Sequence, residues 1–281
     1  LIRKSKVGTG SFAIQNTIPE EDLRFSFELC KKMASFSFPS IEPEEELKEY
    51  TFEDSLQVLD TFPDCDLKEG LSAILSDKSK FHDHLKIPGS NGVCVPLPYF
   101  KESYWGVSDM KPSVVLHEAL HAYDFQKKNY DVDLYPYSIE APAYAMTFFT
   151  VKEEEKKNYL SSISVFANQL IARGCYHRTL CPPFQLEQAR YDQMEDPYCF
   201  SHPLLTLKNI FIGYALAKEM KENKEAGFAQ LEDVLATTFH SGQIPDYSRF
   251  GVTNEVLVDT VLEMGQDLHS SLEKSTVKKQ N

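Results

Sequence analysis

Apolar residues recur at every third or fourth position through most of the second half of the chain. This spacing gathers them on one face of an α-helix. It predicts helices over residues 141–151, 159–172, 204–220, 228–239 and 252–272. The second half is therefore expected to be almost entirely helical.

The first half carries shorter helical signals. Ile18-Pro19-Glu20 is typical of a helix start, because proline is accepted in a first turn and acidic side chains there complement the helix dipole. Two further short helices are predicted over residues 52–62 and 67–75, with a turn at Pro63-Asp64 between them.

One strand is predicted before the longest apolar stretch of the chain. A turn signal at Asn91-Gly92 precedes an alternation of apolar residues, and Pro96 and Pro98 confine the strand to the edge of a sheet. An extended peptide could pair with such an edge, although a buried connector is an equally good interpretation. The fold class is therefore α+β and predominantly α-helical. We expect residues 1–110 and 111–281 to form two parts of one compact unit.

Composition restricts the partners more than the fold. The formal net charge of −13 over 281 residues argues against a nucleic-acid partner, because phosphate backbones require a basic surface. No apolar run is long enough to predict a transmembrane helix. The chain begins at Leu1 rather than methionine, which we interpret as processing or trimming, so a cytoplasmic and an exported protein are both compatible with the sequence.

Six cysteines are present without any Cys-x-x-Cys pair. This pattern predicts neither a zinc ribbon nor an obvious disulfide framework. Free buried thiols are the simpler expectation, and three disulfides in a secreted protein are the alternative. A second histidine pair, His82 and His84, is interpreted as surface or capping residues, because side chains two apart on a helix face different directions.

An apolar stretch over residues 114–124 contains the pattern His-Glu-x-x-His, formed by His117, Glu118 and His121. Residues four apart lie on one face of a helix, so the two imidazoles can reach one metal ion. The surrounding valine, leucine and alanine residues predict a largely buried helix, in which an imidazole needs a partner. We expect a zinc-binding helix, with a Ser108-Asp109 cap and Pro112 in its first turn. The alternative is a structural or decayed site.

A catalytic zinc ion usually has three protein ligands and one open position. Glu140 is the candidate third ligand, at the start of a second helix that Ser138 would cap. Asp131 and Asp133 are rival ligands. Asp124 is a third rival, but we expect it either to accept a hydrogen bond from a ligand imidazole or to be a plain exposed carboxylate.

These two segments resemble the gluzincin branch of the zincin metallopeptidases, whose third ligand is a glutamate on a following helix. The resemblance covers residues 117–124 and 140–145. It implies that His117, His121 and Glu140 are zinc ligands in a zincin-like fold and that Glu118 is the general base.

The chain also departs from better-defined zincin patterns. The metzincin extension requires glycine at position 124 and histidine at position 127, where this chain has Asp124 and Lys127. The thermolysin-like pattern Asn-Glu-x-x-x-Asp is absent as well, because Ile139 precedes Glu140 and Tyr144 stands four residues after it. The resemblance therefore indicates a clan rather than a named family.

The function expected from these patterns is zinc-dependent hydrolysis of peptide bonds. A donor to the oxyanion is also needed, and the candidates are Tyr144, His177, His202, His240 and Tyr247. The irregular stretch over residues 174–198 is expected to line the site. The rival function is a non-catalytic zincin-like module with a structural or empty metal site, which would bind another protein through the acidic residues 42–54.

Overall fold

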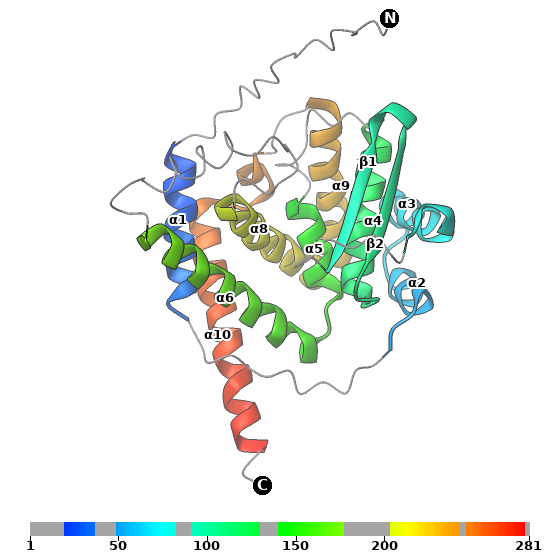
Figure 1. Cartoon of the computed structure of the whole chain (residues 1–281). Coiled ribbons are helices and arrows are strands. Elements are labelled where there is room, and N and C mark those ends of the chain that lie inside the picture. Colours follow the sequence, from blue (N-terminus) through cyan, green and yellow to red (C-terminus); the bar gives the residue numbers. More distant parts are fainter. Residues whose placement is uncertain are drawn as a thin grey trace, which may run out of the picture.

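A computed structural model describes residues 20–36, 49–82, 91–129, 140–176, 203–241 and 246–278. Within these ranges the chain is mostly helical, with one two-stranded antiparallel hairpin (Figure 1). The prediction of a predominantly helical α+β fold with a small β element before the metal-site helix is confirmed. None of the described helices is long and apolar enough to cross a lipid bilayer.

The main elements follow the predicted order along the chain. Their bounds are α1 (Glu20–Ala34), α2 (Phe52–Asp60), α3 (Asp66–Ser76), β1 (Gly92–Leu97), β2 (Glu102–Val107), α4 (Pro112–Lys127), α5 (Glu140–Thr150), α6 (Glu153–Tyr176), α8 (Pro203–Glu222), α9 (Lys224–Ser241) and α10 (Asn254–Lys278). Each predicted helix in the described ranges therefore exists, with ends that differ by a few residues.

Helix α5 lies between α4 on one side and α8 on the other (Figure 1). Its Ala141, Ala143 and Ala145 are fully buried, and these small side chains let the neighbouring backbones approach closely. Gly213 of α8 faces the same helix: a β-carbon there would lie 2.8 Å from the Ala141 carbonyl oxygen. α4 and α5, which carry the predicted metal ligands, are thus held together by dense helix packing.

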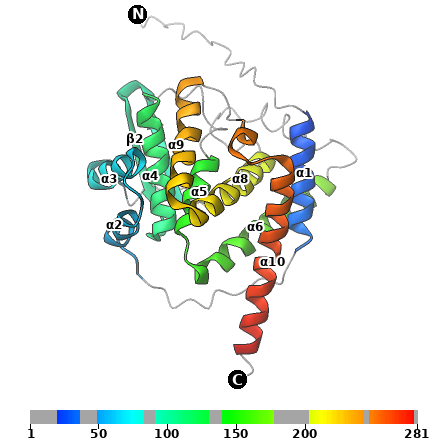
Figure 2. The same ribbon diagram turned by 180° about the vertical axis from the view of Figure 1, so that it is seen from behind.

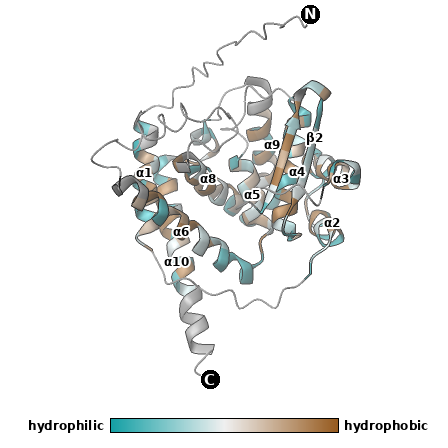
Figure 3. Ribbon diagram, in the orientation of Figure 1, coloured by the Kyte–Doolittle hydropathy of each residue, from teal (hydrophilic) through white to brown (hydrophobic). Residues whose placement is uncertain are grey.

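The remaining helices cover this central layer from both sides. α2 and α3 pack on α4, whereas α1, α6 and α10 pack on one another and α1 and α10 also contact α8 (Figures 1 and 2). α8 is coloured as largely hydrophobic, while the first turns of α6 are hydrophilic (Figure 3). The apolar core therefore runs through α4, α5 and α8.

The hairpin pairs β1 with β2 over six residues, from Gly92 opposite Val107 to Leu97 opposite Glu102. β1 is the predicted edge strand, and in the described part of the chain its one partner strand is β2. β2 was not predicted. Its other edge is bridged by Phe81. The hairpin packs on α4 and places β1 beside the metal-site helix.

Two local predictions are wrong. The N-cap of α4 is Lys111 rather than Ser108 or Asp109, although Asp109 accepts a hydrogen bond from the Lys111 amide at 3.1 Å. The mixed charges of residues 152–157 predict a solvated segment, and this prediction is wrong at one position. Glu155 is buried in the first turn of α6 and accepts a hydrogen bond from the Tyr50 hydroxyl at 2.5 Å. Glu155 thus has a tertiary partner that sequence spacing does not reveal.

Other predictions fall outside the described residues. These are the Ser138 cap, the rival ligands Asp131 and Asp133, His84, residues 177–198 of the irregular stretch and residues 42–48 of the acidic block. Among described cysteines, Cys30 and Cys94 are buried free thiols and Cys65 is a partly exposed one. The expectation of free thiols is therefore confirmed for these three residues.

A buried ion pair lies at the C-terminal end of α4. Lys128 donates to Asp124 at 2.7 Å, and their side chains are 2% and 0% exposed. Burial raises the pKa of Asp124 to about 6, although Lys128 acts in the opposite direction. Because this folded-state pKa lies above the value of the unfolded chain, the carboxyl group favours folding below pH 4 and loses that contribution as the pH rises through 6.

We predict that Lys128→Met will destabilise the fold by about 3–5 kcal/mol at pH 7.5, because it leaves an unpaired buried carboxylate. The loss should be smaller at pH 5, where Asp124 takes up a proton. Urea unfolding at both pH values measures this difference. Lys127→Met, one residue earlier and exposed, is the control. Equal losses at the two pH values would contradict the prediction.

We predict that Gly213→Ala will destabilise the fold by about 1–3 kcal/mol, because the added methyl group overpacks the α5–α8 contact. Its β-carbon would lie 2.5 Å from Cβ of Tyr144 and 2.8 Å from the Ala145 nitrogen, so backbone must move. Chemical denaturation measures the loss, and Lys218→Ala on the exposed side of α8 should cost less than about 1 kcal/mol. A wild-type unfolding free energy for Gly213→Ala would contradict the proposed tightness of this contact.

Candidate metal centre

Several polar residues of α4 lie inside the protein core. Its sequence places Val114, Val115 and Leu116 before the first histidine, and all three are buried. His121 is 3% exposed and Glu118 is 7% exposed. The helix is therefore buried on nearly all sides, as its sequence predicts, and its ionisable groups lie in an environment of low polarity.

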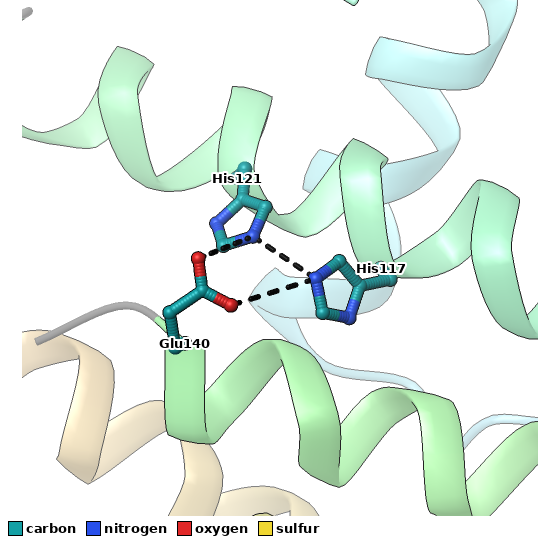
Figure 4. A group of neighbouring side chains, drawn as sticks. All are labelled: His117, His121 and Glu140. Carbon is teal, nitrogen blue, oxygen red and sulfur yellow. Dashed lines mark hydrogen bonds and ion pairs between the residues drawn. The ribbon is translucent and has the colours of Figure 1, made fainter. Parts of the chain in front are cut away.

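The three predicted ligands converge on one point (Figure 4). Nε2 of His117 and Nε2 of His121 are 3.1 Å apart. The two carboxylate oxygens of Glu140 lie 3.8 Å from Nε2 of His117 and 3.7 Å from Nε2 of His121. The two histidines come from consecutive turns of α4, and Glu140 comes from the first turn of α5.

These separations suit a common cation. Ligand atoms that each lie about 2 Å from a tetrahedral zinc ion stand about 3.3 Å from one another. The candidate ligand atoms all lie within 4.8 Å of one another. Two imidazoles and one carboxylate form a donor set that zinc accepts, and it leaves one tetrahedral position for water or substrate.

Burial determines the electrostatics of the site. It lowers the pKa of His117 to about 4 and holds the pKa of His121 well below its usual range. It also raises the pKa of Glu140 to about 7. Both imidazoles are therefore neutral at pH 7, which is the form that binds a metal.

Thr147 lies beside the His117 imidazole. Its hydroxyl lies 2.9 Å from Nδ1 of His117 and within hydrogen-bond distance of the carbonyl oxygens of Ala143, at 3.2 Å, and Ser113, at 3.4 Å. In the tautomer that would bind a metal through Nε2, Nδ1 carries the proton and donates it to this hydroxyl, which can in turn donate to one of the carbonyls. Thr147 was not singled out from the sequence, although it stands seven residues after Glu140, on the same face of α5.

Asp124 does not have the partner expected for it. Its carboxylate accepts from Lys128, its Oδ1 has no hydrogen bond among the described residues, and Nδ1 of His121 is likewise buried without a partner. The hypotheses that Asp124 orients a ligand imidazole or is simply exposed are both wrong for this structure. Lys128 stands four residues after Asp124, on the same face of the helix, and its ammonium group forms an ion pair with the Asp124 carboxylate.

Glu118 lies close to the centre but is not one of its three converging ligands. Burial first, and the neighbouring Glu140 carboxylate second, raise its pKa well above the usual value. A carboxylate with increased proton affinity beside an open coordination position is suited to take a proton from water.

Two tyrosines lie near the candidate centre. The Tyr144 ring packs edge-on against the His117 imidazole, with centroids 5.0 Å apart. Burial and the charge of Glu140 raise the pKa of Tyr144, so its hydroxyl stays protonated. Tyr159 of α6, not considered from the sequence, is also close enough to Glu118 for that carboxylate to raise its pKa.

Among the other expected oxyanion donors, the structure describes the side chain of Tyr247 alone, and it gives Tyr247 no contact with the candidate ligands. Tyr247 is buried, and the carboxylate that raises its pKa, after burial itself, is Asp124. His177 and His202 lie outside the described residues, and the His240 side chain is not described. Of the five candidates, the structure brings Tyr144 against a candidate ligand.

A scan against protein-family models, a search of curated proteins and a search of solved structures each returned no match. The likeness to gluzincins is a likeness of site: a His-His-Glu group formed by one helix and the first turn of the next.

Proposed function

We propose that this chain is a zinc-dependent hydrolase that cleaves peptide bonds. One observation carries the proposal: His117, His121 and Glu140 converge on one point, while a further buried carboxylate, Glu118, stands beside them without joining them. A purely structural zinc site has no need of a basic group next to its ligands, whereas hydrolysis does.

Zinc in this position would supply Lewis acidity, which polarises a carbonyl group and lowers the pKa of water. Glu118 accepts the proton of the attacking water and delivers it to the leaving amine. Its raised pKa supports both transfers, because a base must hold the proton long enough to return it as an acid.

Tyr144 is the candidate donor to the oxyanion. It stands one turn after Glu140 on α5, and its ring contacts the His117 imidazole. Because its hydroxyl remains protonated over the working pH range, it can donate a hydrogen bond to a developing negative charge.

The edge of β1 is the proposed peptide-binding surface. In the described part of the chain β2 is the one strand paired with β1, so the opposite edge of β1 has no partner strand there. An extended peptide can add to such an edge through main-chain hydrogen bonds. The packing of the hairpin on α4 brings this surface to the metal-site helix.

The second candidate function is a structural metal site in a binding module. The side chains of His117 and Glu140 are only 14% and 13% exposed, which is the observation that favours it. Zinc retention without cleavage of any member of a peptide library would support this alternative.

We predict that the protein binds about one zinc ion per chain. His121→Ala should lower the zinc affinity by more than about 100-fold, because removing a ligand costs more than removing a residue that only contacts a ligand, which costs roughly 10–100-fold. Binding should weaken as the pH falls below 7, because Glu140, with a pKa near 7, then holds a proton that competes with zinc. Zinc content by mass spectrometry and metal titration at pH 7.5 and 5.5 measure both effects. His269→Ala, an exposed histidine on α10, is the control. An unchanged zinc affinity in His121→Ala would reject the ligand assignment.

We predict that Glu118→Gln will keep its zinc and lower kcat by about 10²–10⁴-fold, because the amide cannot accept the proton. Cleavage of a fluorogenic peptide library by zinc-loaded protein measures kcat. Glu222→Gln, exposed on α8, should behave as wild type. Loss of zinc from Glu118→Gln would instead make Glu118 a ligand, and an unchanged kcat would remove it from the mechanism.

A further inference from the structure

The first residue of β1 lies directly against Glu118. A β-carbon built on Gly92 would be 2.5 Å from Cγ, 2.6 Å from Oε1 and 2.8 Å from Cδ of Glu118. Real β-carbons do not approach other heavy atoms so closely, so any larger residue at position 92 must displace this side chain or the strand. The strand backbone therefore forms one wall of the space that the carboxylate occupies.

Backbone conformation does not explain the glycine. Among the described glycines, Gly251 is the one with a positive φ, at 76°. Gly92 is paired with Val107 in an ordinary antiparallel register that any residue can adopt. What Gly92 supplies is therefore space for Glu118 rather than a special turn.

The neighbouring strand position supports this geometry. Side chains two apart on a strand point to the same side, so Cys94 shares the face of position 92. Cys94 is buried, and after burial itself the Glu118 carboxylate is the main cause of its raised pKa. This face of β1 is thus turned toward Glu118 along at least three residues.

We propose that Gly92 is a positioning residue for Glu118: the missing side chain lets β1 begin in contact with the carboxylate and keeps it beside the two imidazoles. The catalytic meaning of this contact rests on the proposed function, whereas the contact itself does not. Glu118 has rotatable side-chain bonds and β1 is held by its ladder, so an added methyl group moves the carboxylate first. A displacement of about 1 Å at a catalytic group can cost about 100-fold in rate.

The first arm of the test is kinetic. Gly92→Ala should retain about one zinc ion per chain and lose about 100-fold in kcat, with KM changed by less than about threefold. Val256→Ala, an exposed position on α10, should keep wild-type kcat and zinc. Wild-type kcat in Gly92→Ala, or an equal loss in Val256→Ala, would overturn the proposal.

The second arm needs no activity. Glu118→Asp shortens the carboxylate side chain by one methylene group, which makes room for the added methyl. The melting temperature of the double variant Gly92→Ala/Glu118→Asp should therefore be higher than the sum of the two single changes allows. Strict additivity of the two changes would overturn the contact.

A spectroscopic arm separates positioning from a purely structural contact. In cobalt(II)-substituted protein the visible spectrum reports the surroundings of the ion. Gly92→Ala and Glu118→Gln should both shift the pH midpoint of the change in this spectrum, and Val256→Ala should not. If wild-type protein binds metal without cleaving peptides, the proposed function fails, but the spectral shift and the coupled melting temperatures still decide the role of Gly92.

Discussion

The burial of ionisable groups on α4 is the constraint on which the site depends. Two imidazoles and two carboxylates lie in or beside a helix whose other faces are packed with apolar residues. Desolvation drives His117 and His121 toward neutrality and raises the proton affinity of Glu118 and Glu140. Because buried charge is expensive without a counter-charge, a divalent cation bound at the candidate site would make this arrangement favourable.

The packing of α5 converts this constraint into a defined geometry. Its buried alanines face α4 and α8. Because Gly213 of α8 has no side chain, the backbones of α5 and α8 can approach closely. This close approach brings Glu140 to both imidazoles, while Thr147 of the same helix binds the opposite nitrogen of His117. One helix therefore supplies both the third ligand and the group that orients the first, so a shift of α5 would disturb the two together.

Short-range patterns explain which parts of the structure could be predicted from the sequence. His117 and His121 follow from helical spacing, and the start of α5 follows from the apolar run after Glu140. β2 and the Gly92 contact depend on residues distant in sequence. Asp124 was misassigned because helical spacing placed both His121 and Lys128 within its reach, and only the folded chain shows that the charged partner takes it. The end-cap of α4 was misplaced for a similar reason, since Ser108 donates to the Asn91 carbonyl across the hairpin instead.

The two carboxylates of the site, Glu118 and Glu140, have the same chemistry and differ in their positions. Burial raises the proton affinity of both, and the Glu140 carboxylate further disfavours ionisation of Glu118. Glu140 faces both imidazoles, so a bound cation would act on it most strongly and favour its ionised form. Glu118 is held on the other side by the start of β1 and stays outside the converging atoms. The cation would thus ionise one carboxylate as a ligand and leave the other with the proton affinity that a base needs. In the proposed mechanism, the contact between Gly92 and Glu118 would decide which acid is ligand and which is base.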